Sequence, residues 1–399
     1  MNPTTERPAD SPATGQAAAG AADLLYGEAE TELRAAVRAL LEDRCGWREV
    51  LARTEASQTC DTRLWRVLAA DLGCSGLLIP QSRGGAGASY REAAVVAEET
   101  GRAVAPVPFL GSAVVATAAL LAVGDDLLAG LADGTATAAL AVPFAAMPGA
   151  RQHPTVRIGS SPGDGPAAYP LSGTVTGVAD ALAADVLLVP ADGVPYGLYA
   201  TAADGPGVCR QPVVSLDMTR QLVDVIFDGA PARRVASGEA AERAVAGGLA
   251  AGAAMLACEQ LGTAERCLEM TVAYLKERRQ FGRLLGSFQA LKHRAADLWV
   301  GVTQSRAAAR YAAACLAAGH PDAAVAVPLA KAACCDIAVR AAQECVQLHG
   351  GIGFTWEHPC HLYLKRAKTS SIAFGTSDRH RASLAGLVDL PAPPREAEE

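Results

Sequence analysis

Two stretches in the C-terminal third carry the most information about the fold: Arg278–Gly282 (RRQFG) and Gln347–Phe354 (QLHGGIGF). Apolar residues recur at helical spacing before each of them, with Leu268, Val272 and Leu275 preceding the first. Because the glycine pair of the second stretch follows a helix, it differs from the dinucleotide-binding glycines of a βαβ unit, which follow a strand. The two stretches therefore predict breaks between the long helices of a C-terminal bundle.

Outward from these stretches, the chain changes character twice. Leu33, Val37 and Leu41 recur at helical spacing near the N-terminus, whereas β-branched runs such as Val186–Val189 and Val223–Phe227 alternate with Gly-, Pro- and Asp-rich turns in the middle. We expect an α+β fold with these parts: a disordered tail (1–22), an N-terminal helical domain (23–132), a central β-barrel or sandwich (133–236), a C-terminal four-helix bundle (237–390) and a polar tail (391–399).

Composition excludes several classes of protein. Half of the 399 residues are apolar but only 5% are aromatic, so Ala, Leu and Val must fill the interior. A net charge of −7 without a basic stripe argues against nucleic acid as a partner. No apolar run reaches the roughly 18 residues of a membrane span. The 11 cysteines are odd in number and scattered, which predicts reduced thiols in a soluble, cytoplasmic chain.

The order of helical, β and helical parts, together with the short motifs, resembles the acyl-CoA dehydrogenase family over nearly the whole chain. The matching stretches are Leu72–Pro80, Gly84-Gly85 and Glu98–Gly101 in the first domain, and Arg278–Gly282, Phe288-Gln289 and Gln347–Phe354 in the last. The resemblance implies an FAD-dependent oxidoreductase of lipid metabolism that desaturates an acyl-CoA thioester between its α and β carbons.

In that family a desolvated Glu removes the α-proton, and its two known positions carry no carboxylate here. One position, just before Gly375-Thr376, is Phe374, and the other falls at Gly252. Glu259 lies two helical turns from Gly252, and about 10 Å of axial rise is too far to substitute. Asp378 is a weak candidate, because a carboxylate there suits a helix N-terminus better. We therefore expect no catalytic base in this chain.

The middle domain also departs from the family pattern. The stretch that holds the flavin ring in family members corresponds to Pro143–Ala150, and the strand that packs against the ring corresponds to Gly173–Asp180. Neither stretch keeps the polar residues that contact the ring. The resemblance thus predicts a degraded ring pocket.

Residues for the ADP half of FAD are kept, and the family resemblance implies that they bind FAD seated in a neighbouring subunit. They are Arg278, Gln280, Phe281, Phe288, Gln289, Gln347, Gly350 and Gly351. An arginine suits a pyrophosphate oxygen, and glycines let backbone N–H groups approach closely. This division resembles the base-less subunit of bacterial α2β2 acyl-CoA dehydrogenases, whose characterised members act on CoA esters of steroid side chains. A paralogous subunit, an acyl-CoA and an electron-transfer flavoprotein are the implied partners.

Simpler interpretations stay open for several residues. Arg278 also suits the dipole at a helix C-terminus, and Gly350-Gly351 suits a helix C-cap. His358, Cys360 and His361 lack a second cluster of ligands in the sequence, so we predict no metal site. For the whole chain, the alternatives are a self-sufficient homotetrameric flavoenzyme with an unusual base, and a non-catalytic acyl-CoA-binding scaffold.

Overall fold

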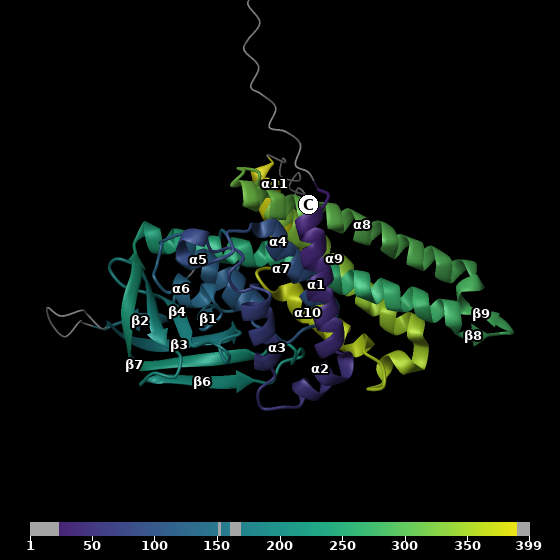
Figure 1. Cartoon of the computed structure of the whole chain (residues 1–399), viewed down its shortest axis with the longest axis horizontal. Coiled ribbons are helices and arrows are strands. Elements are labelled where there is room, and N and C mark those ends of the chain that lie inside the picture. The colour runs from purple at the N-terminus through teal and green to yellow at the C-terminus, as the bar shows by residue number, and fades with distance from the viewer. Residues whose placement is uncertain (1–23, 151–152, 160–168, 389–399) are drawn as a thin grey trace, which may run out of the picture.

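The computed structural model describes residues 24–150, 153–159 and 169–388. Its strands form a β-domain at one end of the molecule, and long helices extend to the other end (Figure 1). The expected order of a helical, a β and a helical part is confirmed. The two predicted tails, 1–22 and 391–399, lie outside the described residues.

The N-terminal part is helical as expected. Its helices are α1 (Glu28–Arg44), α2 (Trp47–Thr54), α3 (Thr62–Arg66), α4 (Tyr90–Ala103), α5 (Thr117–Leu121) and α6 (Leu128–Ala132), with π-helical turns η1 (Val67–Asp71) and η3 (Phe109–Ala116) and a 3-10 turn η2 (Gln81–Arg83). α4 begins at a capping box, in which the Ser89 hydroxyl accepts from the Arg91 N–H and the Glu92 carboxylate accepts from the Ser89 N–H.

In the middle of the chain, seven strands of the described residues form one sheet, in the order β1-β4-β5-β7-β3-β2 with β6 also paired to β7. They are β1 (Ala138–Leu140), β2 (Val156–Ile158), β3 (Tyr169–Ala179), β4 (Val186–Ala191), β5 (Gly197–Ala202), β6 (Val208–Val213) and β7 (Leu222–Ser237). Among the paired strands of the described residues, β1–β4 is the one parallel pair and the others are antiparallel. The 16-residue β7 pairs with β5 near its end and with β3 and β6 near its start, so side chains from both halves of the sheet meet in one apolar cluster.

The C-terminal part is a bundle of long helices. Its elements are α7 (Glu239–Glu277), the hairpin β8 (Arg279–Gln280) and β9 (Arg283–Leu284), η4 (Leu285–Ser287), α8 (Gln289–Ala318), α9 (Ala323–His349), η5 (Gly350–Phe354), α10 (Cys360–Ile372) and α11 (Ser377–Leu387). α7 is central, since it packs on α4, α8 and α9. The β8–β9 hairpin lies at the end of the molecule opposite the β-domain (Figure 1).

Small side chains let α4 and α7 touch backbone to backbone. A Cβ built on Gly262 of α7 would overlap the Glu98 carbonyl of α4, and one built on Gly101 of α4 would overlap the Glu259 carbonyl of α7. The close helix packing that follows from an interior of small residues is therefore present where these helices cross.

Among the described residues, α7 is long and apolar enough to cross a bilayer, judged by length and composition alone. The sequence predicted no uninterrupted apolar run of that length. Of its most apolar 18-residue window, 83% is buried inside the protein. A buried helix of this kind serves as the core of a bundle, because its apolar side chains already pack against neighbouring helices.

Candidate functional site

Positions 252 and 374, where the family places its base, lie against each other. Phe374 is 4% exposed and has a left-handed φ of 52°. A Cβ built on Gly252 would lie 2.8 Å from Phe374 Cζ and 2.8 Å from Val115 Cγ2. The ring of Phe374 thus occupies the space that a side chain at position 252 would need. Neither position carries a carboxylate, and the single ring of Phe374 fills the space beside both residues.

Phe144, from the stretch that aligns with the flavin-ring loop, closes the same space. Its ring meets that of Phe374 edge-on, with centroids 5.4 Å apart at 75°. Its carbonyl oxygen accepts a 2.8 Å hydrogen bond from the Phe374 N–H. These contacts hold Phe374 in its left-handed conformation, which an aromatic residue rarely adopts without support.

The free space beside these rings is about 20 Å³, room for about one water molecule. Its lining is apolar apart from one carboxylate: Leu110, Gly111, Val115, Leu140, Val142, Phe144, Ala179, Asp180 and Phe374. Ligand pockets occupy roughly 300 Å³ or more. The space beside Phe374 is therefore far smaller than a pocket for a flavin ring or for the reacting end of an acyl thioester.

Asp180 is the one acid that lines this space, and the sequence interpretation missed it as a candidate. Its carboxylate accepts a 3.0 Å hydrogen bond from the Gly111 N–H. Burial raises the pKa of Asp180 above its usual value, against the attraction of Arg220. A raised pKa is what a general base needs. No sequence motif indicates this role, because only the fold brings the end of β3 beside Phe374.

Glu259 is committed to buried ion pairs. Its carboxylate lies 2.5 Å from Arg220 and 3.7 Å from Arg366, which in turn lies 3.6 Å from Asp217. Burial alone would raise the pKa of Glu259, but the two guanidinium groups overcome this and lower it. Glu259 is thus an ionised structural partner, which agrees with the expectation that it does not replace the base.

Asp378 lies in the first turn of α11, where a helix N-terminus was expected. Its side chain is 92% exposed and pairs with Arg381 at 3.3 Å. A carboxylate in this setting is solvated, whereas the base of this reaction has to be desolvated.

The residues expected to bind ADP lie on exposed segments around the ends of α7 and α9. Arg278 is the C-cap of α7, as its simpler interpretation requires, yet its exposed guanidinium has no hydrogen-bond or ion-pair partner among the described residues. The rings of Tyr274, four residues before it, and His349, just before Gly350, have centroids 4.5 Å apart. This contact brings the two diagnostic stretches to the same region of the bundle.

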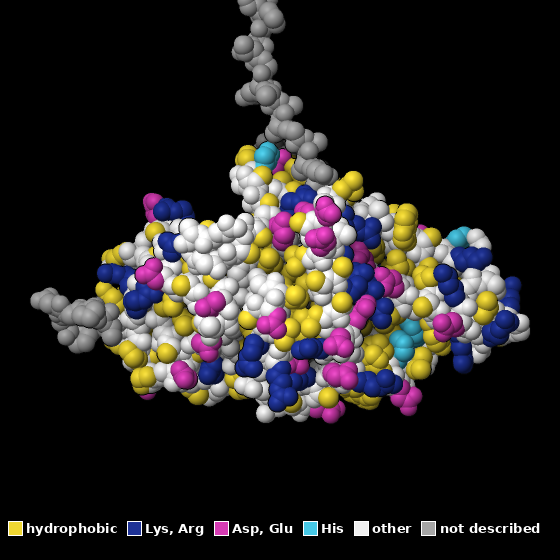
Figure 2. Space-filling model, viewed as in Figure 1, with side chains coloured by type: hydrophobic (Ala, Val, Ile, Leu, Met, Phe, Trp, Pro, Cys, Tyr) yellow, Lys and Arg dark blue, Asp and Glu magenta, His cyan; other side chains and the backbone are white. Residues whose placement is uncertain are grey.

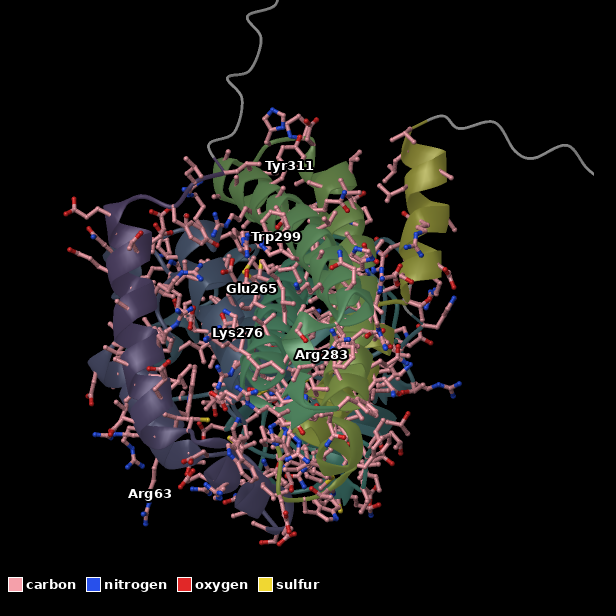
Figure 3. All side chains as sticks on the ribbon, turned by 90° about the vertical axis from the view of Figure 1, so that its right-hand side faces the viewer. Arg63, Glu265, Lys276, Arg283, Trp299 and Tyr311 are labelled. Carbon is pink, nitrogen blue, oxygen red and sulfur yellow. The ribbon has the colours of Figure 1, made fainter. Side chains whose placement is uncertain are left out.

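The hairpin after α7 turns through Phe281 and Gly282, both with positive φ (51° and 74°). Two left-handed residues in succession fit the tight turn of a two-residue hairpin. The turn leaves Phe281 88% exposed, and the Arg283 guanidinium lies 3.8 Å above the Phe288 ring. Lys and Arg side chains gather at this end of the molecule (Figure 2). Figure 3 looks onto the same end, where Lys276 and Arg283 lie toward the viewer.

The remaining expected residues are also on the surface. Gln347 is exposed, and Gln289 contacts the His293 ring at 2.9 Å through its side-chain nitrogen. Gly350, with φ of 64°, is the C-cap of α9, so its simpler interpretation holds. Gly351 has no positive φ, and a Cβ there would meet nothing within 4 Å. Nothing inside the chain explains a glycine at position 351.

The expectation that His358, Cys360 and His361 have no second cluster of ligands beside them is wrong. Cys345 and His349 of α9 lie next to Cys360, and the ligand atoms of these three residues are all within 4.8 Å of one another. Sequence spacing could not reveal this, because α9 and α10 are brought together only by the turn between them.

Comparison with known proteins identifies the class. The acyl-CoA dehydrogenase N-terminal domain matches residues 27–128 and the acyl-CoA dehydrogenase C-terminal domain matches residues 242–387. The chain belongs to the acyl-CoA dehydrogenase family, whose members are FAD-dependent oxidoreductases.

Individual relatives and solved structures show which members of the family this chain is similar to. The chain is 36% identical to acyl-CoA dehydrogenase IpdE2 of Mycobacterium tuberculosis over 85% of its own length and 91% of that protein. A variant of the Tcur3481-Tcur3483 steroid ACAD superposes with a TM-score of 0.79 at 31% identity, covering 91% of this chain and 98% of that one. The ChsE4-ChsE5 complex from M. tuberculosis gives a TM-score of 0.81 at 28% identity, covering 93% and 100%.

Proposed function

We propose that this chain is the base-less subunit of a heteromeric acyl-CoA dehydrogenase and that it contributes the ADP-binding half of an FAD site in a partner subunit. The observation that carries the proposal is the packing of Phe374 on Gly252, which leaves about 20 Å³ where the reaction would take place. This close packing supports a chain that relies on its partner to seat the flavin ring and to remove the α-proton.

The basic end of the molecule supports the donation of ADP contacts. Between positions 276 and 283 the sequence has four cationic side chains and one carboxylate, which favours a diphosphate. Arg278 is free to form charge-assisted hydrogen bonds to a pyrophosphate oxygen. Gly351 lets a backbone N–H come close to the ligand, since no Cβ stands in the way.

An apolar groove on the bundle supports the presence of a partner subunit. The groove runs between α8 and α9, has a volume of about 610 Å³ and is lined by residues such as Ala308, Tyr311, Leu329 and Ile337. Trp299, 60% exposed, lies farther along α8, as the side view shows (Figure 3). Exposed apolar surface of this kind is typical of subunit interfaces.

These features assign different parts of the reaction to this chain and to its partner subunit. FAD, when bound, supplies the acceptor for the β-hydride. The α-proton goes to a carboxylate of the partner, because this chain has none at either position. The names of the Tcur3481-Tcur3483 steroid ACAD and the ChsE4-ChsE5 complex favour a steroid CoA ester as substrate and a second subunit as partner. An electron-transfer flavoprotein as the final acceptor is part of the same proposal.

The test is to purify the full chain alone and together with a paralogue that carries Glu at one of the two base positions. Alone it should hold almost no flavin and show no dehydrogenation; the pair should hold FAD and turn over. Arg278→Ala should weaken FAD retention by the pair about tenfold or more, since a charge-assisted hydrogen bond is lost. Arg63→Ala, an exposed arginine on α3, is the matched control and should change nothing. Stoichiometric FAD and turnover in the isolated chain would refute the proposal.

One observation favours a second candidate, a self-sufficient flavoenzyme: Asp180 lines the small cavity with a raised pKa. This candidate predicts that Asp180→Asn abolishes turnover of the chain alone, whereas Glu259→Gln and Asp378→Asn do not. Under our proposal the Asp180→Asn subunit, paired with its partner, retains activity. The Arg278→Ala variant also tests the scaffold alternative. If the chain is a scaffold that binds no flavin, this substitution should leave the flavin content of the pair unchanged.

A further inference from the structure

A cluster of thiol and imidazole groups lies beneath the Gly350-Gly351 turn and takes no part in the function proposed above. Cys345 and His349 are four residues apart on α9, so they project from the same face of that helix. Cys360 begins α10, and His358 precedes it by two residues. Cys345 and Cys360 are fully buried and His349 is 3% exposed. These thiol and imidazole groups come from the end of α9, from the start of α10 and from the segment that joins the two helices.

The spacing of the ligand atoms fits one metal ion. Cys345 Sγ lies 3.3 Å from Cys360 Sγ and 3.7 Å from His349 Nδ1, and His358 Nδ1 lies 3.0 Å from Cys360 Sγ. Around tetrahedral zinc, with Zn–S of about 2.3 Å and Zn–N of about 2.0 Å, neighbouring ligand atoms are about 3.3–3.8 Å apart. Cys345, His349 and Cys360 have ligand atoms within 4.8 Å of one another, and His358, which contacts Cys360, is the candidate for the fourth ligand.

We propose that Cys345, His349, His358 and Cys360 form a structural zinc site that joins the end of α9 to the start of α10. Two thiolates balance the charge of Zn²⁺, so the bound site is neutral overall, as a buried location requires. Four protein ligands leave no open position, which distinguishes a structural site from a catalytic one.

The surroundings supply the supporting contacts that metal sites use. Cys267 of α7, also fully buried, lies in hydrogen-bonding contact with Cys345. The His349 ring contacts the rings of Tyr274 and His358 at a tilt, with centroids 4.5 and 4.4 Å away. His349 Nδ1 also lies 2.6 Å from the Cys345 carbonyl oxygen, and binding through Nδ1 exchanges this hydrogen bond for a metal bond. His358 is only partly buried, which gives an ion a path from solvent.

The consequence is local. The ion would fix both ends of the segment 350–357, which is otherwise held by η5 and by contacts such as that of the Trp356 ring with His361. Because the site is structural, its presence does not depend on FAD or on a partner subunit. Its failure would leave the proposed function intact, and the reverse also holds.

The experiment uses the full chain without a polyhistidine tag, produced with zinc in the medium and purified under a mild phosphine reductant without chelators. Elemental analysis should give about one zinc per chain. Exchange for Co²⁺ should give the visible d–d bands and the near-ultraviolet thiolate charge-transfer band of a tetrahedral thiolate site. Cys345→Ser and Cys360→Ser should each reduce the zinc content at least tenfold. Cys334→Ser, a fully buried thiol on the same helix that contacts the Ser305 carbonyl instead, should retain zinc.

Two results would overturn the proposal. One is wild-type protein that holds no zinc after loading while all its thiols titrate as free on unfolding. The other is a Cys345–Cys360 disulfide, seen by peptide mass mapping without reduction, since the 3.3 Å between the sulfurs is also short enough for oxidation to join them. Both readouts use wild-type protein, so they decide the question even if a serine variant does not fold.

Discussion

Phe374 and Gly252 are packed as a complementary pair: the aromatic ring ends 2.8 Å from where a Cβ of residue 252 would be. In the family these are alternative places for one carboxylate, so a catalytic member needs open space between them. Here the space is filled, and Phe144 and Val115 complete the packing. The absence of a carboxylate at positions 374 and 252 is thereby coupled to close packing of the core around Phe374.

A Gly252→Ala substitution tests this pair. The added methyl must displace Phe374 or Val115, and overpacking of this kind costs about 1–3 kcal/mol, whereas Ala in place of Gly in a helix gains about 1 kcal/mol. We expect Gly252→Ala to lower the free energy of unfolding by about 1 kcal/mol, measured by urea denaturation. Gly247→Ala, in the same helix but with nothing within 4 Å of its Cβ, should raise it. Equal stability of the two variants would contradict the packing argument.

His380 should make the protein sensitive to acid. It is 1% exposed, its Nε2 contacts the Phe374 carbonyl at 2.9 Å, and its Nδ1 has no partner in the described structure. Burial lowers the pKa of His380 from 6.5 to about 4. The unfolded chain therefore takes up a proton near pH 6.5 that the folded chain refuses until about pH 4, so stability is lost as pH falls through this window.

The measurement is the free energy of unfolding at pH 7 and pH 5. His380→Gln, which keeps a nitrogen donor for the Phe374 carbonyl, should remove about 2 kcal/mol of the pH-dependent loss. His361 has a pKa lowered to about 4 in the same way, so a smaller loss should remain in the variant. An unchanged pH dependence in His380→Gln would show that the ring is solvated.

Gly351→Ala tests the ADP contact without disturbing the fold. Because its Cβ would meet nothing within 4 Å, stability should change by less than about 0.5 kcal/mol. The same Cβ faces the proposed ligand, so the complex with the partner subunit should retain less FAD after gel filtration. Gly386→Ala, another open position on the surface of α11, is the control and should leave FAD retention unchanged. Normal flavin retention in Gly351→Ala would remove this residue from the proposed site.

Much of the architecture follows from local sequence. The stripe of Leu268, Val272 and Leu275 lies in α7, and the runs Val186–Val189 and Val223–Phe227 lie in β4 and β7. Helical and strand periodicities are properties of neighbouring residues, so they survive without knowledge of the fold. The family motifs likewise predicted the order of the helical, β and helical domains.

Such reasoning could predict only part of the candidate site. Phe374 and Gly252 could be named as lacking a carboxylate, because position within a motif is a sequence property. That Asp180 lines the cavity could not be foreseen, since it depends on how the end of β3 packs on η3 and on Phe374. Cys345 and Cys360 are likewise 15 residues apart along the chain, yet their sulfurs are 3.3 Å apart.

The sequence by itself determined which side chains occupy positions 252 and 374: a Gly and a Phe, neither of which can accept a proton in any conformation. Tertiary structure alone decided what took its place, because the packing of η3, the Phe144 loop and α7 around one ring sets how much room remains. Distances between segments remote in the chain come from the balance of packing over the whole interior, and no local pattern records them.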